Sequence, residues 1–177
     1  MRTIGVISDT HGQLRPEALQ ALEGSDLILH AGDVGGSDIL DALNQIAPTY
    51  AVFGNTDYGT LRAALPHSQV VDLMAVDPAG ADQPNTDTNP VLAYVLHINE
   101  EIDLDPQAAG MKMVVFGHTH EPFIRERDGV LWMNPGSAGP RRFSLPVTVG
   151  RVRISHSDGE ASFEAEILDL GLDSGGD

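Results

Sequence analysis

The sequence predicts an α/β protein, and two observations support this fold class. In the first half of the chain, short strand-like apolar runs alternate with helical patterns, which is the rhythm of βαβ units. In the second half, strand-like runs follow one another with little helical pattern between them. A third observation indicates a functional site, because clusters of Asp, His, Asn and Gly follow several of these runs.

The first half begins with a predicted strand, and two more strands follow at regular intervals. Residues 2–8, 26–30 and 49–53 are apolar runs that turn formers separate, so each predicts a strand. Between the first two strands, Pro16 suits the first turn of a helix. Gly24 is the expected end of that helix.

The length of 177 residues suits one domain, which we place at residues 1–172, with a disordered tail at 173–177.

Ser37 is the expected N-cap of a second helix, which Pro48 closes. Residues 77–90 contain many turn formers and no apolar periodicity, so they predict a long loop. The strands predicted in the second half cover residues 69–76, 91–97, 112–116, 122–127, 130–133, 146–154 and 161–169.

The chain carries 26 Asp and Glu against 10 Lys and Arg, which gives a formal net charge of −16. A protein that binds long nucleic acid must neutralise several phosphates with cations, so this balance argues against DNA or RNA as a large substrate. No apolar run approaches the ~18 residues that a membrane-spanning helix needs. The chain opens on a strand-like stretch and contains no cysteine, so we expect a cytoplasmic protein without a membrane partner.

Metal-ligand residue types follow the predicted strands in five separate places. In open α/β sheets, the loops at the carboxyl ends of strands converge on one crevice. Oxygen and imidazole donors without thiolate suit Mn, Fe, Ni, Co or Zn. A set of seven is too large for one tetrahedral zinc and suits two ions that share a carboxylate. The candidate ligands are Asp9, His11, Asp33, Asn55, His97, His118 and His120.

Two pairs of candidate ligands have a spacing of two residues. Asp9 and His11 form one pair, and His118 and His120 form the other. In an extended segment, alternate residues project to the same side. We therefore expect each pair to lie at a strand end with both side chains on one side.

Four motifs occur in a fixed order: Asp9-x-His11, Gly32-Asp33-x-x-Gly36, Gly54-Asn55-x-Asp57 and Gly117-His118-x-His120. Together they resemble the calcineurin-like metallophosphoesterase superfamily. The size of the chain and its segment 134–141 resemble the small bacterial and archaeal phosphodiesterase branch, which is related to the retromer scaffold subunit. The resemblance implies a four-layer αββα sandwich of two mixed sheets flanked by helices.

The resemblance also implies how two divalent transition-metal ions are held, with manganese expected first and Fe, Ni, Co or Zn as alternatives. A hydroxide that bridges the ions would attack phosphorus in line, while Asp33, Asn55 and His118 act as catalytic residues. The ion ligands implied are Asp9, His11 and His120 for one ion and Asn55, His97 and His118 for the other, with Asp33 bridging them.

The sequence departs from the superfamily pattern at two positions. Many members have a histidine after the Asn, which can protonate the leaving group, whereas this chain has Thr56. The histidine before the last motif is normally followed by glycine, whereas His97 is followed by Ile98.

Arg141 and Arg142 are candidate substrate-binding residues that could form bidentate contacts with a phosphate, with surface carboxylates as the alternative partners.

We expect a phosphodiesterase that acts on a small phosphoester. The alternatives are a phosphomonoesterase or nucleotide phosphatase, and a non-catalytic protein-binding scaffold of the same fold. A nuclease is disfavoured by the acidic surface.

His30 is expected to be structural, with a hydrogen bond that supports a metal ligand as the alternative. Asp57 is expected to orient the Asn55 loop. The oligomeric state stays open, with a homodimer as one option.

Overall fold

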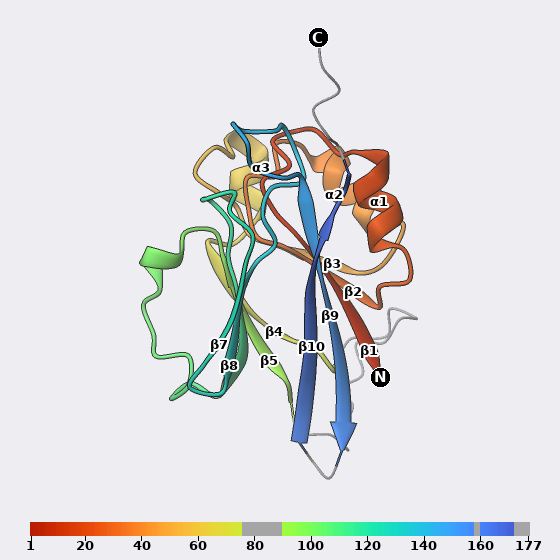
Figure 1. Cartoon of the computed structure of the whole chain (residues 1–177). Helices are drawn as coiled ribbons and strands as arrows, with labels where there is room; N and C mark the ends of the chain where they lie inside the picture. The colour runs from red at the N-terminus through yellow and green to blue at the C-terminus, as the bar shows by residue number, and fades with distance from the viewer. Residues whose placement is uncertain (76–89, 158–159, 172–177) are drawn as a thin grey trace.

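The computed structural model describes residues 1–75, 90–157 and 160–171. Two mixed five-stranded sheets lie face to face, and both run along the length of the molecule (Figure 1). The predicted α/β sandwich of two mixed sheets is therefore confirmed. None of the helices in these ranges is long and apolar enough to span a membrane.

The first sheet combines a parallel part with an antiparallel hairpin. Its three parallel strands come from the first half of the chain, and Ile4 pairs with Leu27 in the register between the first two. The hairpin comes from the end of the chain and pairs with the N-terminal strand. In order across the sheet, the strands are β10 (Glu160–Asp169), β9 (Thr148–Ser157), β1 (Arg2–Ile7), β2 (Leu27–His30) and β3 (Thr49–Ala51).

The second sheet has three parallel strands in its middle and one antiparallel strand at each edge. All of its strands come from the middle of the chain. In order across the sheet, they are β4 (Ser68–Asp72), β5 (Leu92–Leu96), β6 (Met111–Val115), β8 (Val130–Asn134) and β7 (Phe123–Arg127).

Alternation of side chains along the strands builds the core. In β2, Leu27 and Leu29 point into the layer between the two sheets, whereas Ile28 packs on the helix side of the first sheet. Met113 and Met133 enter the layer between the sheets from the second sheet. Successive residues of a strand face opposite sides, so one buried strand serves two apolar layers.

The two sheets differ in how their outer faces are covered. α1 (Pro16–Leu22) and α2 (Ser37–Asn44) cover the outer face of the first sheet (Figure 1). The outer face of the second sheet is packed by the segment that follows a 3₁₀ turn, η1 (Asn99–Glu101), through Ile102 and Leu104. The second helical layer is thus reduced to one short turn.

Several local expectations need correction. Ser37 is the first residue of α2, and Gly36 occupies the N-cap position without a side-chain hydrogen bond. A short helix, α3 (Gly59–Ala64), was not predicted, because its six residues bury no side chain and so leave no apolar pattern. The predicted loop 77–90, except Pro90, and the predicted tail 173–177 lie outside the described residues.

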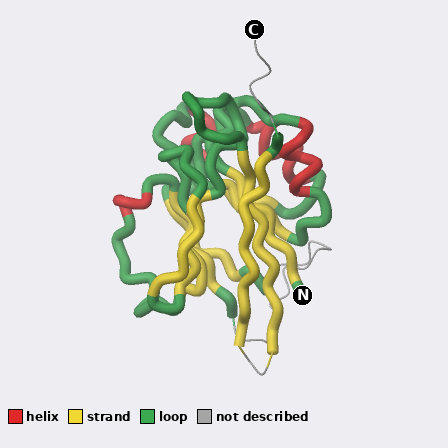
Figure 2. The backbone as a smooth tube through the Cα atoms, in the orientation of Figure 1, coloured by secondary structure: helices red, strands yellow, loops and turns green. Residues whose placement is uncertain are grey.

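The predicted strands are present with shifted bounds, which include β4 at Ser68–Asp72 rather than 69–76 and β9 at Thr148–Ser157 rather than 146–154. Figure 2 shows that loops and helices collect at one end of the two sheets. The parallel strands of both sheets end there, so the polar motifs that follow them meet at this end.

Candidate metal centre

Five strands deliver the predicted ligands to one place at the carboxyl ends of the parallel strands. The first sheet supplies four of them and the second sheet supplies three. Asp9 and His11 follow β1, Asp33 follows β2, Asn55 follows β3, His97 follows β5, and His118 and His120 follow β6.

The backbone of these loops is strained at the predicted ligands. L residues rarely adopt the left-handed region, which raises the energy by roughly 1–2 kcal/mol per residue, and such strain concentrates at functional sites. Among the described non-glycine residues, only Asp128 and Phe143 also have positive φ. Positive φ occurs at Asp9 (56°), His11 (48°), Asp33 (53°), His118 (69°) and His120 (62°).

The expectation of extended ligand pairs is therefore wrong. Both members of each pair are in the left-handed region rather than in extended backbone. The second pair also separates, because His120 lies beside Asp9 whereas His118 lies beside Asn55. Tight turns, and not strand alternation, bring these side chains into the site.

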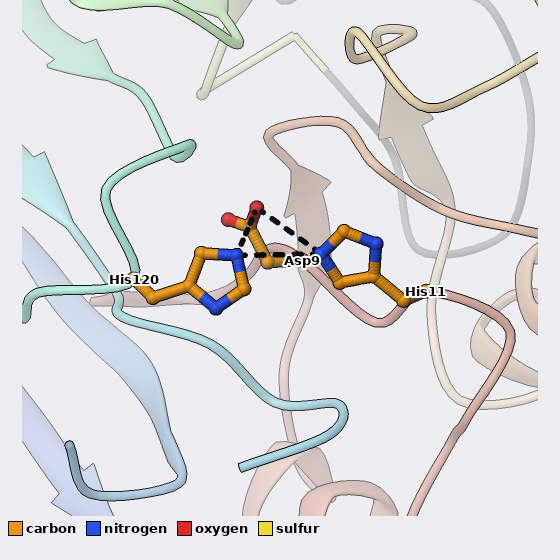
Figure 3. Close-up of side chains that lie close together, drawn as sticks. All are labelled: Asp9, His11 and His120. Atoms are coloured by element: carbon orange, nitrogen blue, oxygen red, sulfur yellow. Dashed lines mark hydrogen bonds and ion pairs between the residues drawn. The ribbon is translucent and has the colours of Figure 1, made fainter. Parts of the chain in front are cut away.

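One cluster contains Asp9, His11 and His120, whose side chains converge on one point (Figure 3). His120 Nε2 lies 3.2 Å from Asp9 Oδ1 and 3.3 Å from His11 Nε2. His11 Nε2 lies 3.8 Å from Asp9 Oδ1. Ligand atoms that bind one ion at roughly 2.0–2.2 Å lie about 3 Å apart, so this spacing suits a divalent ion.

Two buried atoms of this cluster, Asp9 Oδ1 and His120 Nδ1, have no hydrogen-bond partner in the part of the chain that the structure describes. The other carboxylate oxygen, Asp9 Oδ2, accepts hydrogen bonds from Ser8 Oγ (2.6 Å) and His118 N (3.1 Å). A buried polar atom without a partner destabilises a fold by roughly 1–3 kcal/mol. A cation bound to Asp9 Oδ1 would remove that penalty, so the donor set fits a metal ion.

A second cluster forms around the amide oxygen of Asn55. Asn55 Oδ1 lies 3.0 Å from His97 Nε2 and 3.0 Å from His118 Nδ1. His97 Nε2 lies 3.4 Å from Asp33 Oδ2. A grouping by carboxylates and imidazoles alone places Asp9 with Asp33 and His97. The contacts of the amide oxygen favour the set with Asn55 and His118.

Asp33 lies between the two clusters. Its Oδ2 is 3.4 Å from His97 Nε2 and 3.8 Å from His11 Nε2, and its Oδ1 accepts a hydrogen bond from Thr56 N at 2.8 Å. Burial raises the pKa of Asp33, but hydrogen bonds from His97 and Thr56 outweigh it and hold that pKa well below the ordinary value. The carboxylate is therefore ionised and can contact an ion on either side.

His97 is oriented by its other ring nitrogen. Nδ1–H donates to Ala31 O at 2.8 Å, which leaves Nε2 to face the site. Burial lowers the pKa of His97, yet its contacts with Asp33 and Asp9 raise the pKa above the ordinary value. The ring fills the space beside Gly32, where a Cβ would lie 2.7 Å from His97 Nδ1. Ile98 does not prevent His97 from reaching the cluster.

Asp57 ties two of the loops together, as its motif led us to expect. Its carboxylate accepts hydrogen bonds from Val34 N (3.1 Å), Gly35 N (2.8 Å) and Gly54 N (2.8 Å). The loops that carry Asp33 and Asn55 are thereby held at a fixed separation. Asp57 belongs to neither group of candidate ligands found among the described residues.

His30 is buried beneath the Asp33 loop and supports it by hydrogen bonds. Its Nδ1 accepts from Gly32 N at 3.2 Å, so Nε2 carries the proton and donates to Thr10 Oγ1 at 2.9 Å. Thr10 Oγ1 in turn donates to Val34 O at 2.8 Å. Burial lowers the pKa of His30 to about 4. The sequence did not single out Thr10, because a threonine between two ligands has no distinctive spacing.

Arg141 and Arg142 are exposed on a loop that is anchored to the site. The anchor is Ser137 Oγ, which donates to Asp9 O at 3.0 Å. Burial is the main reason why the pKa of His11 is lowered. The carboxylates of Asp33 and Asp9 act in the opposite direction, and the charges of His120 and Arg142 have smaller lowering effects.

The chain matches the model of the calcineurin-like phosphoesterase superfamily domain over residues 1–157. A protein of Methanothermobacter thermautotrophicus described as a probable metallophosphoesterase is similar along most of its length. The two are 35% identical over an alignment of 178 residues, which covers 95% of this chain and 92% of that protein.

Two solved structures show the same fold. An archaeal phosphodiesterase has a TM-score of 0.67 at 20% identity, and the match covers 94% of this chain and 99% of that one. Vps29 of Entamoeba histolytica, complexed with Zn²⁺, has a TM-score of 0.65 at 18% identity, with 96% and 99% covered. On the family model and the sequence relative, this chain belongs to the calcineurin-like phosphoesterase superfamily.

Proposed function

We propose that this protein is a metal-dependent phosphodiesterase that hydrolyses a small phosphoester with two divalent ions. The observation that carries the proposal is the position of Asp33 Oδ2 between two donor clusters, 3.8 Å from His11 Nε2 and 3.4 Å from His97 Nε2. One ion would be held by Asp9, His11 and His120, the other by Asn55, His97 and His118, and Asp33 would contact both.

Family membership supports phosphoesterase chemistry, and the archaeal phosphodiesterase of the same fold supports a diester. The Vps29 complex with Zn²⁺ supports a divalent ion on this fold. When bound, two such ions lower the pKa of a water molecule and neutralise charge on a phosphate. Manganese is our first expectation for the ion. Nitrogen and oxygen donors of this kind also accept Fe, Ni, Co or Zn, which stay as alternatives.

The seven residues differ in burial, and His11 is half-buried. Asp9, Asp33, His97 and His120 are buried, whereas Asn55 and His118 are exposed. The buried carboxylates hold charge where water cannot screen it. Asn55 and His118 face the side from which a substrate can enter, and they would stabilise the charge that grows on the phosphoryl oxygens.

The leaving group receives little help from the position after Asn55. Thr56 has its hydroxyl 3.3 Å from His11 Nδ1, and a hydroxyl at this point is a poor proton donor at neutral pH. We therefore expect substrates whose leaving group departs without a proton to react faster than simple alkyl esters.

The test begins with protein stripped of metal and reloaded with Mn, Ni, Co or Zn. Elemental analysis should give two ions per chain, and hydrolysis of bis(p-nitrophenyl) phosphate should exceed that of p-nitrophenyl phosphate. Asp33→Asn should lower kcat/KM at least ~100-fold, the upper range for loss of support around a metal. The matched control is Asp41→Asn, an exposed carboxylate on α2. Full activity of Asp33→Asn would contradict the proposal, and faster monoester hydrolysis would favour a phosphomonoesterase.

A protein-binding scaffold is the second candidate, and one surface favours it. All five residues of the edge strand β7 are exposed, and they include Phe123 and Ile124. An exposed apolar edge strand is a common place for another chain to bind. Metal-loaded protein that hydrolyses none of the phosphoesters above would favour this function over catalysis.

A further inference from the structure

A pocket of about 680 Å³ lies on the outer face of the second sheet. Side chains of β7 and β8 form one side of this pocket, and the segment that follows η1 forms the other; Figure 1 shows that segment beside the two strands. The residues that line it, all within the described ranges, include none of the seven candidate ligands. Sites for small molecules commonly have volumes of roughly 300–1,000 Å³, so the pocket is large enough for a small ligand.

Three aromatic side chains line the pocket: Phe116, Phe123 and Trp132. The ring centroids of Phe116 and Phe123 lie 6.0 Å apart, with 51° between the ring planes. Trp132 packs against the apolar cluster that contains Phe116. Phe116 is buried, whereas Trp132 is half-buried and Phe123 is 40% exposed. Two of the three rings therefore keep accessible surface, against which a planar ring can pack.

A cation lies on the same face of the sheet, because side chains alternate along β7. Phe123, Arg125 and Arg127 are alternate residues of this strand, and all three line the pocket. Arg125 lies directly opposite Trp132 in the antiparallel register between β7 and β8. The Cβ atoms of directly opposite residues are roughly 4.5–5.5 Å apart, so the Arg125 side chain begins beside Trp132.

Most of the charged side chains that line the pocket already have a partner. Arg127 Nε donates to Asp128 Oδ2 at 3.2 Å, and Asp105 Oδ1 accepts a hydrogen bond at 3.2 Å from a backbone N–H of its own turn. Within the described ranges, the side chains of Arg125 and Glu121 form no hydrogen bond or ion pair. Arg125 is therefore the cation of this pocket that can bind an anion.

We propose that this pocket is a second binding site, which takes a small ligand with a planar aromatic ring and a single carboxylate. The ring would pack against Phe123 and Trp132, with Phe116 beneath them, and the carboxylate would pair with the guanidinium of Arg125. The inference goes beyond the proposed hydrolysis, because it uses none of the residues that would hold the metal ions.

The charge around the pocket favours a carboxylate over a phosphate. A carboxylate brings one negative charge, whereas a phosphate monoester brings about 1.5 to 2 near neutral pH. Glu121 repels both, and this repulsion grows with the charge of the ligand. A ligand with one negative charge therefore gains the contact with Arg125 at the smaller electrostatic penalty.

The test uses fluorescence, because Trp132 is the only tryptophan of the chain and reports on the pocket directly. Zinc-loaded protein is titrated with 3-phenylpropanoate, 3-phenylpropanamide, 3-phenylpropylamine and propanoate. The first should change the Trp132 emission and bind about tenfold more tightly than propanoate, which lacks the ring. It should bind about fivefold more tightly than the neutral amide, because a charged acceptor strengthens the hydrogen bonds of Arg125. The amine should bind more weakly than the amide.

Two variants test the side chains that carry the proposal. Arg125→Gln should bring the affinities for the carboxylate and the amide together, and Phe123→Ala should weaken the binding of 3-phenylpropanoate more than that of propanoate. Ile124→Ala is the matched control for Phe123→Ala. Ile124 is 37% exposed but pairs with Met133, which points between the sheets. Arg153→Gln removes a cation of the first sheet, and both controls should keep wild-type affinities.

Competition separates the pocket from the metal centre, with which it shares a loop. Thr119 lines the pocket and lies between His118 and His120, and a carboxylate can also bind metal ions. Inorganic phosphate, a ligand for the ions, should therefore leave the binding of 3-phenylpropanoate unchanged. Displacement by phosphate, an unchanged Trp132 emission, tighter binding of the amine, or an Arg125→Gln variant that still prefers the carboxylate would each overturn the inference and leave the proposed hydrolysis untouched.

Discussion

Replacement of His30 by glutamine tests how the buried hydrogen-bond network beside the site is maintained. His30 Nδ1 accepts from Gly32 N and Nε2 donates to Thr10 Oγ1, so the neutral ring satisfies both neighbours. A second proton on the ring would have to face the Gly32 N–H. Burial lowers the pKa of His30 from 6.5 to about 4, although the carboxylates of Asp9 and Asp57 act in the opposite direction.

The sign of the pH effect follows from this lowered pKa. As the pH falls below 6.5, the unfolded chain takes up a proton at His30, whereas the folded protein takes it up only near pH 4. The stability that the neutral ring contributes is therefore present above pH 6.5 and is lost as the pH falls toward 4. One pKa unit corresponds to 1.36 kcal/mol, so lowering the pH from 7 to 5 should remove about 2 kcal/mol from the free energy of unfolding.

Urea unfolding of the metal-free protein at pH 7 and pH 5 measures this difference. At pH 7, His30→Gln should be less stable by roughly 1–3 kcal/mol, because Gly32 N–H loses its acceptor. Between pH 7 and pH 5, the variant should lose about 2 kcal/mol less than wild type, since glutamine does not titrate. His67→Gln removes an exposed histidine and is the matched control. Equal losses in wild type and His30→Gln would refute the view that His30 is held neutral.

Three further predictions concern the metal centre. A Cβ at Gly54 would overlap the Asp33 carboxylate, so Gly54→Ala should lower kcat/KM roughly 100-fold. Gly110→Ala has open space around it but a positive φ of 76°, so it should lower stability and keep kcat/KM. Thr56→His should raise kcat for alkyl leaving groups by about 100-fold, and an unchanged dependence of rate on leaving-group pKa would contradict this. Free divalent ion at 100 times its Kd should raise the Tm of the chelator-treated protein by roughly 5–10 °C per site, and calorimetry checks that shift.

The fold was largely predictable because its signals are local. In β2, the run of Leu27, Ile28 and Leu29 is apolar throughout, as a strand with both faces buried requires. Helix α2 carries its buried residues Ile39 and Leu43 four positions apart, which is a helical spacing. Patterns of this kind depend on neighbours in the chain, and the sequence contains them in full.

Elements without a fully buried side chain were not predictable by the same reasoning. Helix α3 exposes or half-exposes all six of its residues, so no apolar period marks it. The outer face of the second sheet is covered by Ile102 and Leu104 of an irregular segment rather than by a regular helix. The number of helical layers therefore depended on how a short loop packs, which residue spacing does not determine.

The ligands of the site were predictable from the sequence, whereas the contacts that position them were not. The order of the motifs indicated which residues to expect, but the reason for their glycines lies in distant parts of the chain. Gly32 lacks a Cβ because the His97 ring fills that space, and a Cβ at Gly117 would lie 2.7 Å from Asp9 Oδ2. Each glycine thus makes room for a ligand from another loop. A residue pattern read along one loop identifies such a glycine as a turn former, and only the packing of two loops shows that it positions a ligand.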